Sequence, residues 1–239
     1  ENSSIDKIRK ELESLLVADF AGKGLNMMAD TGLMAVIVGE EVSRKMNTRE
    51  MQCFTTLCEN IDKTKPIRTR RLGLLYTCFD EKRGLAAIER MNFDSETHQH
   101  LVDAMKEMTK IYFIANGQDL KLYLVEHGMD RYNYIHNLSK AHRIVYDQWD
   151  NKIKNRIYLL NEIHKNGEAI FVEDLANDAN DLIEAGIATK ENAGQILLML
   201  TDVVHKKPVL NTRKDLLLHA KKFSKNKFMA SLRRVNWIK

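Results

Sequence analysis

Apolar residues recur every three or four positions along most of the chain, which is the spacing of one face of an α-helix. The cleanest stripe consists of Leu101, Ala104, Met105, Met108, Ile111 and Tyr112. A second stripe, near the C-terminus, consists of Ile196, Leu197, Leu200, Val203 and Val204. These patterns predict amphipathic helices that bury one face against their neighbours.

Polar residues mark the predicted helix starts. Ser3 can cap a first helix, with Asp6 three residues later, and Asn47 can cap another, with Glu50 completing a capping box. The apolar run at 33–38 could form a strand, but no alternating partner strand accompanies it. We therefore interpret this run as a buried helix.

Glycines mark the predicted interruptions. Gly22 and Gly24 are expected to break the chain before a short apolar helix around Leu25. A long, charged helical pattern covers residues 133–165 and is expected to end at Gly167.

Composition supports the same fold class. The 239 residues include only two prolines and eleven glycines, and few helix breakers over this length favour a mostly helical chain. No fixed-period repeat or long linker is present, so we predict an all-α, elongated array of helices joined by short connections. Because no signal peptide or 18-residue apolar run is present, we expect a cytoplasmic protein that does not enter a membrane. The cysteines at 53, 58 and 78 form no C-x-x-C pair and are interpreted as reduced, small apolar residues.

Positive charge is concentrated at the C-terminal end, where no Asp or Glu follows Asp215. The basic residues of this end are Lys221, Lys222, Lys225, Lys227, Arg233, Arg234 and Lys239, and Arg213 opens the helix that leads into it. Clustered Lys and Arg can neutralise phosphates and release counterions, so the pattern indicates a nucleic-acid partner. A solvated terminus explains the same charges, and Arg213 has a local alternative, in which it pairs with a nearby acid.

A second basic cluster, Arg68, Arg70 and Arg71, stands at a predicted helix start. Cations there oppose the helix dipole, which favours a functional reason such as phosphate binding. The competing interpretation is a solvated helix end.

Motifs that carry catalysis are not found. The chain has no Walker loop, no G-x-S-x-G and no H-E-x-x-H. His98 and His100 are two positions apart, which places them on different faces of a helix. Asp178, Asp181 and Glu173 could gather a cation, but helix capping explains them more simply.

Several segments in order resemble the C-terminal helical region of bacterial class II tRNA nucleotidyltransferases, the CCA-adding enzyme and poly(A) polymerase family. Residues 4–12 (SIDKIRKEL) are similar to that family's neck helix, and 24–34 (GLNMMADTGLM) to its G-L-x-L-L-x-x-T-G-L-L segment. Residues 71–75 (RLGLL) resemble the R-L-A-A-L-L that precedes an H-D pair in many members. Similarity to the family's last domain continues through 180–187 (NDLIEAGI), 194–197 (GQIL) and 211–217 (NTRKDLL).

The departures from the family pattern concern its catalytic parts. The G-G-x-V-R-D and D-x-D segments of the head and the base-reading E-D-x-x-R segment are missing, and the chain begins where the latter would end. Residues 76–80 (YTCFD) and 54–56 (FTT) stand where some relatives carry H-D hydrolase ligands. Residues 189–191 (TKE) replace a P-G-P turn, which puts backbone contacts there in doubt.

The resemblance implies neck helices at 1–40, a helical body with a degenerate HD-like region at 41–165, and a helical tail at 166–239. It implies a chain that holds tRNA by backbone charge and shape and is inactive alone, while a head domain elsewhere adds nucleotides to the 3′ end. ATP, CTP and Mg²⁺ would then bind only through that head, and we expect no cofactor in this chain.

The expected RNA-binding residues are Arg68, Arg70, Arg71, Arg213, Lys221, Lys222, Lys225, Lys227, Arg233 and Arg234. The alternative is a protein-interaction or oligomerisation module, in keeping with which a homo-oligomer could form. A relic hydrolase with a rearranged metal site ranks last, because its ligands are missing.

Overall fold

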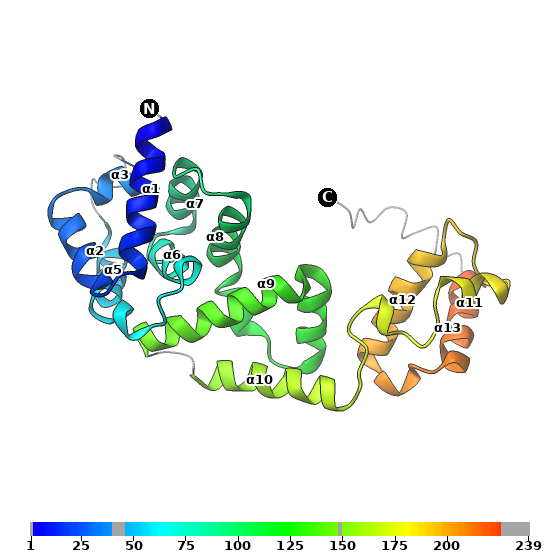
Figure 1. Cartoon of the computed structure of the whole chain (residues 1–239). Coiled ribbons are helices and arrows are strands. Elements are labelled where there is room, and N and C mark those ends of the chain that lie inside the picture. The colour runs from blue at the N-terminus through cyan, green and yellow to red at the C-terminus, as the bar shows by residue number, and fades with distance from the viewer. Residues whose placement is uncertain (1, 40–45, 148–149, 226–239) are drawn as a thin grey trace. The chain divides into compact units, whose positions relative to one another are not determined.

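The structure is a computed structural model that describes residues 2–39, 46–147 and 150–225 (Figure 1). Every regular element in these ranges is a helix and none is a strand, which confirms the predicted all-α class. The described part of the chain also contains no helix that is both long and apolar enough to cross a membrane.

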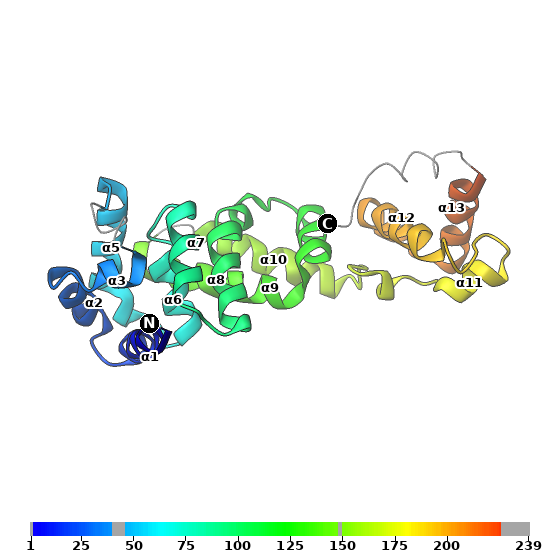
Figure 2. The same cartoon turned by 90° about the horizontal axis from the view of Figure 1, so that it is seen from above.

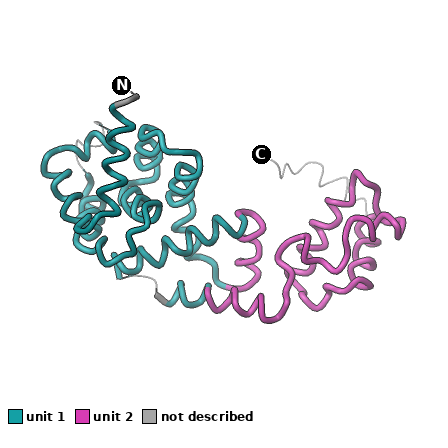
Figure 3. Tube along the Cα trace, in the orientation of Figure 1, with its two compact units in different colours: residues 1–115, 128–156 teal, residues 116–127, 157–239 magenta. Residues whose placement is uncertain are grey.

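The chain forms two compact units (Figure 3). Unit 1 contains residues 1–115 and 128–156, and unit 2 contains residues 116–127 and 157–239. The division into neck, body and tail implied by the resemblance stays a prediction.

Unit 1 is a group of mostly short helices (Figures 1 and 2). Its buried apolar residues include Leu16, Leu72 and Ile88. Its elements are α1 (Asn2–Val17), α2 (Ala21–Asp30), α3 (Met34–Val38), α5 (Thr48–Asn60), η1 (Ile61–Lys63), α6 (Arg68–Tyr76), α7 (Glu81–Arg90), α8 (Ser95–Glu107), η2 (Lys110–Phe113), the later part of α9 (Gly117–Tyr146) and the start of α10 (Asp150–Lys165). Helix α1 packs against α2 and α6, α2 packs against α5, and α8 packs against α6 and α7. The apolar run at 33–38 is helical as predicted, with Met34, Ile37 and Val38 buried in α3.

Gly22 and Gly24 lie inside α2, so the prediction that they break the chain before the helix is wrong. The reason is a close approach between helices. A Cβ atom on Gly22 would lie 1.9 Å from the carbonyl oxygen of Cys58 on α5, which no side chain tolerates. The glycine therefore allows α2 to contact the α5 backbone, and this gain outweighs its low helix propensity.

The long pattern at 133–165 is interrupted in the structure. Helix α9 ends at Tyr146, Asp147 has a φ of 51°, and α10 begins at Asp150. The sequence between 133 and 165 contains no proline or glycine that would predict this interruption. The predicted end is correct, because α10 stops at Lys165 and Gly167 follows with a φ of 60°.

Unit 2 is built around α12. Its further elements are the first part of α9, the rest of α10, η3 (Val172–Asp174), α11 (Ala179–Glu184), α12 (Ala193–Lys206), η4 (Pro208–Leu210) and α13 (Arg213–Lys225). Helix α12 packs against α11 and α13, and its predicted stripe buries Ile196, Leu197, Leu200 and Val204.

A buried lysine also links parts of unit 2. The Nζ atom of Lys121 lies 2.7 Å from Glu168 Oε2 and donates to the carbonyl of His205 at 3.4 Å. His205 Nε2 is 2.8 Å from the carbonyl of Ile170, and burial lowers the pKa of this imidazole. Lys121 thus has a structural role inside the unit and is unavailable to an external ligand.

The two predicted helix caps have different outcomes. Helix α1 already includes Asn2, so Ser3 lies within its first turn and is not its cap. The Asn47 capping box is confirmed: Asn47 Oδ1 accepts the Glu50 N–H at 2.9 Å, and Glu50 Oε2 accepts the Asn47 N–H at 3.0 Å.

Glu50 does more than complete this box. It is 2% exposed, its Oε1 accepts the Asp80 N–H at 3.1 Å, and its Oε2 lies 2.9 Å from Arg83 Nη1. One carboxylate thereby joins the start of α5 to the start of α7.

We expect Glu50→Gln to lower the free energy of unfolding by about 1–3 kcal/mol, because the amide cannot accept all three donors and leaves Arg83 without its buried partner. The exposed Glu59 of the same helix provides a matched control, and Glu59→Gln should change stability by less than about 0.5 kcal/mol. Urea unfolding followed by circular dichroism measures both. Equal midpoints for the two variants would contradict the linking role of Glu50.

Candidate nucleic-acid interface

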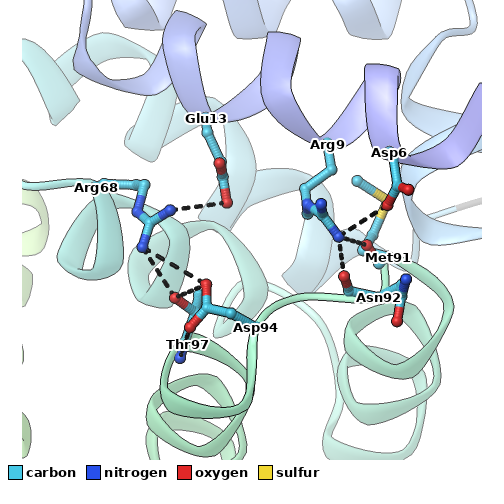
Figure 4. Close-up of polar contacts among 8 residues, drawn as sticks. All are labelled: Asp6, Arg9, Glu13, Arg68, Met91, Asn92, Asp94 and Thr97. Atoms are coloured by element: carbon cyan, nitrogen blue, oxygen red, sulfur yellow. Dashed lines mark hydrogen bonds and ion pairs between the residues drawn. The ribbon is translucent and has the colours of Figure 1, made fainter. Parts of the chain in front are cut away.

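Arg68 begins α6 and connects it to two other helices of unit 1 (Figure 4). Its Nη1 atom lies 3.4 Å from Glu13 Oε1 on α1. Its Nη2 atom donates to Thr97 Oγ1 at 3.1 Å and lies 3.7 Å from Asp94 Oδ2 at the start of α8. Arg68 is half-exposed, but its charge is already opposed by two carboxylates.

Asp94 is held by the same group of contacts. It is the N-cap of α8 and accepts the Thr97 N–H at 2.9 Å and the Thr97 hydroxyl at 2.8 Å. These two hydrogen bonds, followed by the charge of Arg68, lower the pKa of the Asp94 carboxyl. The cost of a cation at the start of α6 is therefore offset by anions from neighbouring elements, without any phosphate.

Arg9 makes a similar connection from the next turns of α1 (Figure 4). Its Nη1 atom donates to the carbonyl of Asn92 and, at 3.4 Å, to that of Met91, and lies 3.1 Å from Asp6 Oδ1. Arg9 and Arg68 together fasten α1 to the segment that joins α7 to α8 and to the start of α8. The positive charges of Arg9 and Arg68 therefore serve contacts between helices of unit 1.

Arg71 is only 3% exposed, and its donors are used inside unit 1. Nη1 donates to the Leu16 carbonyl at 2.8 Å, Nη2 to the Thr64 carbonyl at 2.7 Å, and Nε to Thr64 Oγ1 at 3.2 Å. Asp62 is 3.8 Å away and supplies the opposite charge. The guanidinium is engaged inside unit 1 and cannot reach an external phosphate in this conformation. Arg71 is therefore not part of the candidate interface.

Arg70 differs from its two neighbours. It is partly exposed, it lies near Tyr134, and it has no acidic partner among the residues that the structure describes. The three arginines of one short motif therefore have three different environments, and α6 presents no continuous basic surface.

Helix α13 has a two-sided pattern that α6 lacks. Leu216 and Ala220 are fully buried in the core of unit 2, with Leu217 and Phe223 packed partly against it. The opposite side exposes Lys214, Leu218, Lys221 and Lys222. These four positions are spaced four, three and one residues apart, which places them along one face of a helix. We call this group the α13 lysine face.

The α13 lysine face carries uncompensated charge. Within the described residues, none of Lys214, Lys221 and Lys222 has an ion-pair partner. Asp215 is the one acid of α13, and it accepts a hydrogen bond from the Thr212 hydroxyl at 2.7 Å. Lys206 on α12 provides a contrast, because it lies 2.7 Å from Asp202 Oδ2.

Arg213 is engaged in a local ion pair. Its Nη2 atom donates to Asp181 Oδ1 on α11, although the arginine side chain is largely exposed. Asp181 in turn completes the capping box of α11, accepting the Asp178 N–H at 3.1 Å. In this structure Arg213 therefore pairs with a nearby acid, which was the local alternative to phosphate binding. The pair connects α13 to α11.

The remaining predicted contacts lie outside the described part of the chain. These are Lys227, Arg233, Arg234 and the side chain of Lys225. The sequence pattern does not single out Lys214, because the acid-free segment begins only after Asp215. Its helical spacing to Lys221 and Lys222 is the signal that could have found it.

The segment at 76–80, which the sequence resemblance places at the position of hydrolase ligands, is packed as core. Tyr76 is fully buried with its ring edge-on to Phe93, and Cys78 and Phe79 are also buried. Asp80 caps α7 by accepting the Arg83 N–H at 3.1 Å. Over the described residues, no group of three or more His, Cys, Asp or Glu side chains is placed to hold a metal ion.

No family model, curated protein or solved structure matches this chain. The resemblance to tRNA nucleotidyltransferases therefore rests on the sequence segments alone. The structure adds the location of exposed positive charge that has no ion-pair partner in the described residues, and this location is the α13 lysine face.

The contrast between Arg71 and Arg70 can be tested by stability. Arg71→Met keeps the aliphatic stem but leaves two buried carbonyls without donors, so we expect a loss of about 2–4 kcal/mol in the free energy of unfolding. Arg70→Met removes the same charge and should cost less than about 0.5 kcal/mol. Urea unfolding distinguishes them, and an Arg71→Met variant as stable as Arg70→Met would show that Arg71 is free to contact a ligand.

Proposed function

We propose that this chain is the tRNA-binding region of a nucleotidyltransferase of the CCA-adding enzyme and poly(A) polymerase family. The observation that carries the RNA-binding part is the α13 lysine face, a row of exposed lysines that have no acidic partner among the described residues, on a helix whose other side is buried. The ordered sequence segments support the family and the choice of tRNA. Nucleotide addition, with its Mg²⁺, ATP and CTP, is assigned to the family's head domain.

The chemistry of the face favours backbone contacts. Lysine ammonium groups on flexible stems act as point charges, which suit phosphate oxygens but lack the fork geometry that recognises a base edge. Double-stranded RNA offers proteins mainly its shape, phosphates and 2′-hydroxyls. We therefore propose that α13 follows the backbone of the tRNA elbow or acceptor stem and contributes little sequence selectivity.

A protein-interaction module is the second candidate, and exposed apolar side chains favour it. Leu198 on α12 is 58% exposed, Leu218 on α13 is 52% exposed, and Val209 between these helices is 83% exposed. Apolar side chains at such positions can be covered by a protein partner or a second copy of the chain. The two candidates differ in their response to salt, because phosphate contacts release counterions and apolar contacts do not.

We expect the triple variant Lys214→Glu, Lys221→Glu, Lys222→Glu to bind tRNA at least about tenfold more weakly than the unmodified chain at moderate salt. The slope of log affinity against log salt should become shallower by roughly 0.7–0.9 for each phosphate that the variant no longer neutralises. The weakening should be similar for different tRNAs. Fluorescence anisotropy of labelled tRNA over a salt series measures both quantities.

A matched control separates local contacts from net charge. Lys10, Lys23 and Lys82 are exposed lysines of unit 1 without ion-pair partners in the described structure, and reversing all three makes the same change in net charge. This control should keep the salt slope of the unmodified chain. If both triple variants bind tRNA equally weakly, the net positive charge of the chain explains the binding and a specific contact of α13 does not. If binding is unchanged in both variants and the helical content is retained, the interaction module is favoured.

A further inference from the structure

Two cysteines of unit 1 meet at one tyrosine hydroxyl. Cys53 lies on α5, Cys78 lies in the turn after α6, and Tyr146 is the last residue of α9. Cys53 Sγ donates to Tyr146 Oη at 3.2 Å, and Cys78 Sγ lies 3.3 Å from the same oxygen. The Tyr146 hydroxyl also donates to the Cys53 carbonyl at 3.4 Å. Three elements distant in sequence thereby place two thiols next to each other.

The shared oxygen keeps the two thiols close together, because Cys53 Sγ and Cys78 Sγ lie 3.2 Å and 3.3 Å from it. Both cysteines are free thiols, and they differ in exposure: Cys53 is half-buried, whereas Cys78 is buried. This is the arrangement of an accessible thiol with a protected partner behind it.

The surroundings make the accessible thiol the more acidic one. Interaction with the Cys78 side chain and the hydrogen bond with Tyr146, together with the charge of Arg49 on α5, lower the pKa of Cys53 to about 7 despite partial burial. Burial and the neighbouring sulfur raise the pKa of Cys78 well above its usual value. Burial likewise raises the pKa of Cys58, on the same helix as Cys53, to about 12.

We propose that Cys53 and Cys78 form a hydroperoxide-oxidisable pair, in which Cys53 is the attacking thiol and Cys78 resolves the product to an intramolecular disulfide. This site does not depend on the proposed RNA-binding function. The substrate that we propose is a small hydroperoxide, because Cys53 is only partly exposed.

The first step is an attack of the Cys53 thiolate on one oxygen of the hydroperoxide. A sulfur–oxygen bond forms and the oxygen–oxygen bond breaks. The departing oxygen leaves with the bonding electron pair and takes a proton, so the sulfur is oxidised by two electrons to sulfenic acid and the peroxide is reduced. Cys53 suits this step because a substantial fraction of it is thiolate at neutral pH.

The second step uses the neighbouring thiol. Cys78 loses its proton as its sulfur attacks the Cys53 sulfur, the sulfur–sulfur bond forms, and the hydroxyl of the sulfenic acid leaves with that proton as water. Thiol-based reduction by an external dithiol reverses the bond. The disulfide would join α5 to the turn that leads into α7.

Peptide mapping of the full chain tests the pair. The reduced protein is treated with hydrogen peroxide, remaining thiols are alkylated, and unreduced peptides are identified by mass. We expect a Cys53–Cys78 cross-link that disappears on reduction and that forms equally in Cys58→Ala. In Cys78→Ala, the sulfenic acid on Cys53 should instead persist and be trapped by a 1,3-dicarbonyl reagent.

A second measurement does not depend on any variant. The alkylation rate of Cys53 by iodoacetamide should rise with pH through a midpoint at about pH 7 and level off at higher pH, because the thiolate is the reactive form, whereas Cys58 should remain slow. Cross-links that involve Cys58, or oxidation of all three cysteines at one rate without a Cys53–Cys78 bond, would overturn the proposal.

Discussion

The burial of one side of α13 against α12 is the constraint on which the functional account depends. Leu216 and Ala220 have no exposed surface, so the rotation of the helix about its axis is fixed by the core of unit 2. Lysines at positions 214, 221 and 222 must then point outward together. The hydrophobic effect thereby arranges charges that would be scattered on an unanchored helix, and Arg213 reinforces the arrangement through its ion pair with Asp181 on α11.

Many of the basic side chains in this protein are already paired inside the fold and are not available to a ligand. Arg71 donates all of its described hydrogen bonds to groups inside unit 1, and Arg68 faces two carboxylates. Lys121 is buried with Glu168. These cations stabilise the fold by donating to buried carbonyls and by pairing with carboxylates of neighbouring elements. Uncompensated lysines on α13 are therefore more informative about a phosphate-bearing partner than the denser arginine motif.

Several features set by residues close in sequence could be predicted, although the Ser3 cap was wrong, and features set by distant contacts could not be predicted. The Asn47 box and the inward stripe of α12 follow from spacing along the chain, and both are confirmed. The position of Gly22 inside α2 depends on the carbonyl of Cys58, which only the fold brings near. The burial of Arg71 and the proximity of Cys53 to Cys78 likewise depend on contacts between segments that are distant in the sequence. Part of the candidate interface was predictable, because Lys221 and Lys222 stand in acid-free sequence, whereas the pairing of Arg213 required the structure to decide between two alternatives.

The most direct test of the account is lysine footprinting with and without bound tRNA. The chain is acetylated by a lysine-reactive ester, and the modification of each lysine is quantified by peptide mass. If the α13 lysine face binds the RNA backbone, tRNA should protect Lys214, Lys221 and Lys222, while the exposed lysines at 10, 23 and 82 keep their reactivity. Protection confined to unit 1, or unchanged modification of α13 at saturating tRNA, would contradict the claim that the α13 lysine face binds the RNA backbone.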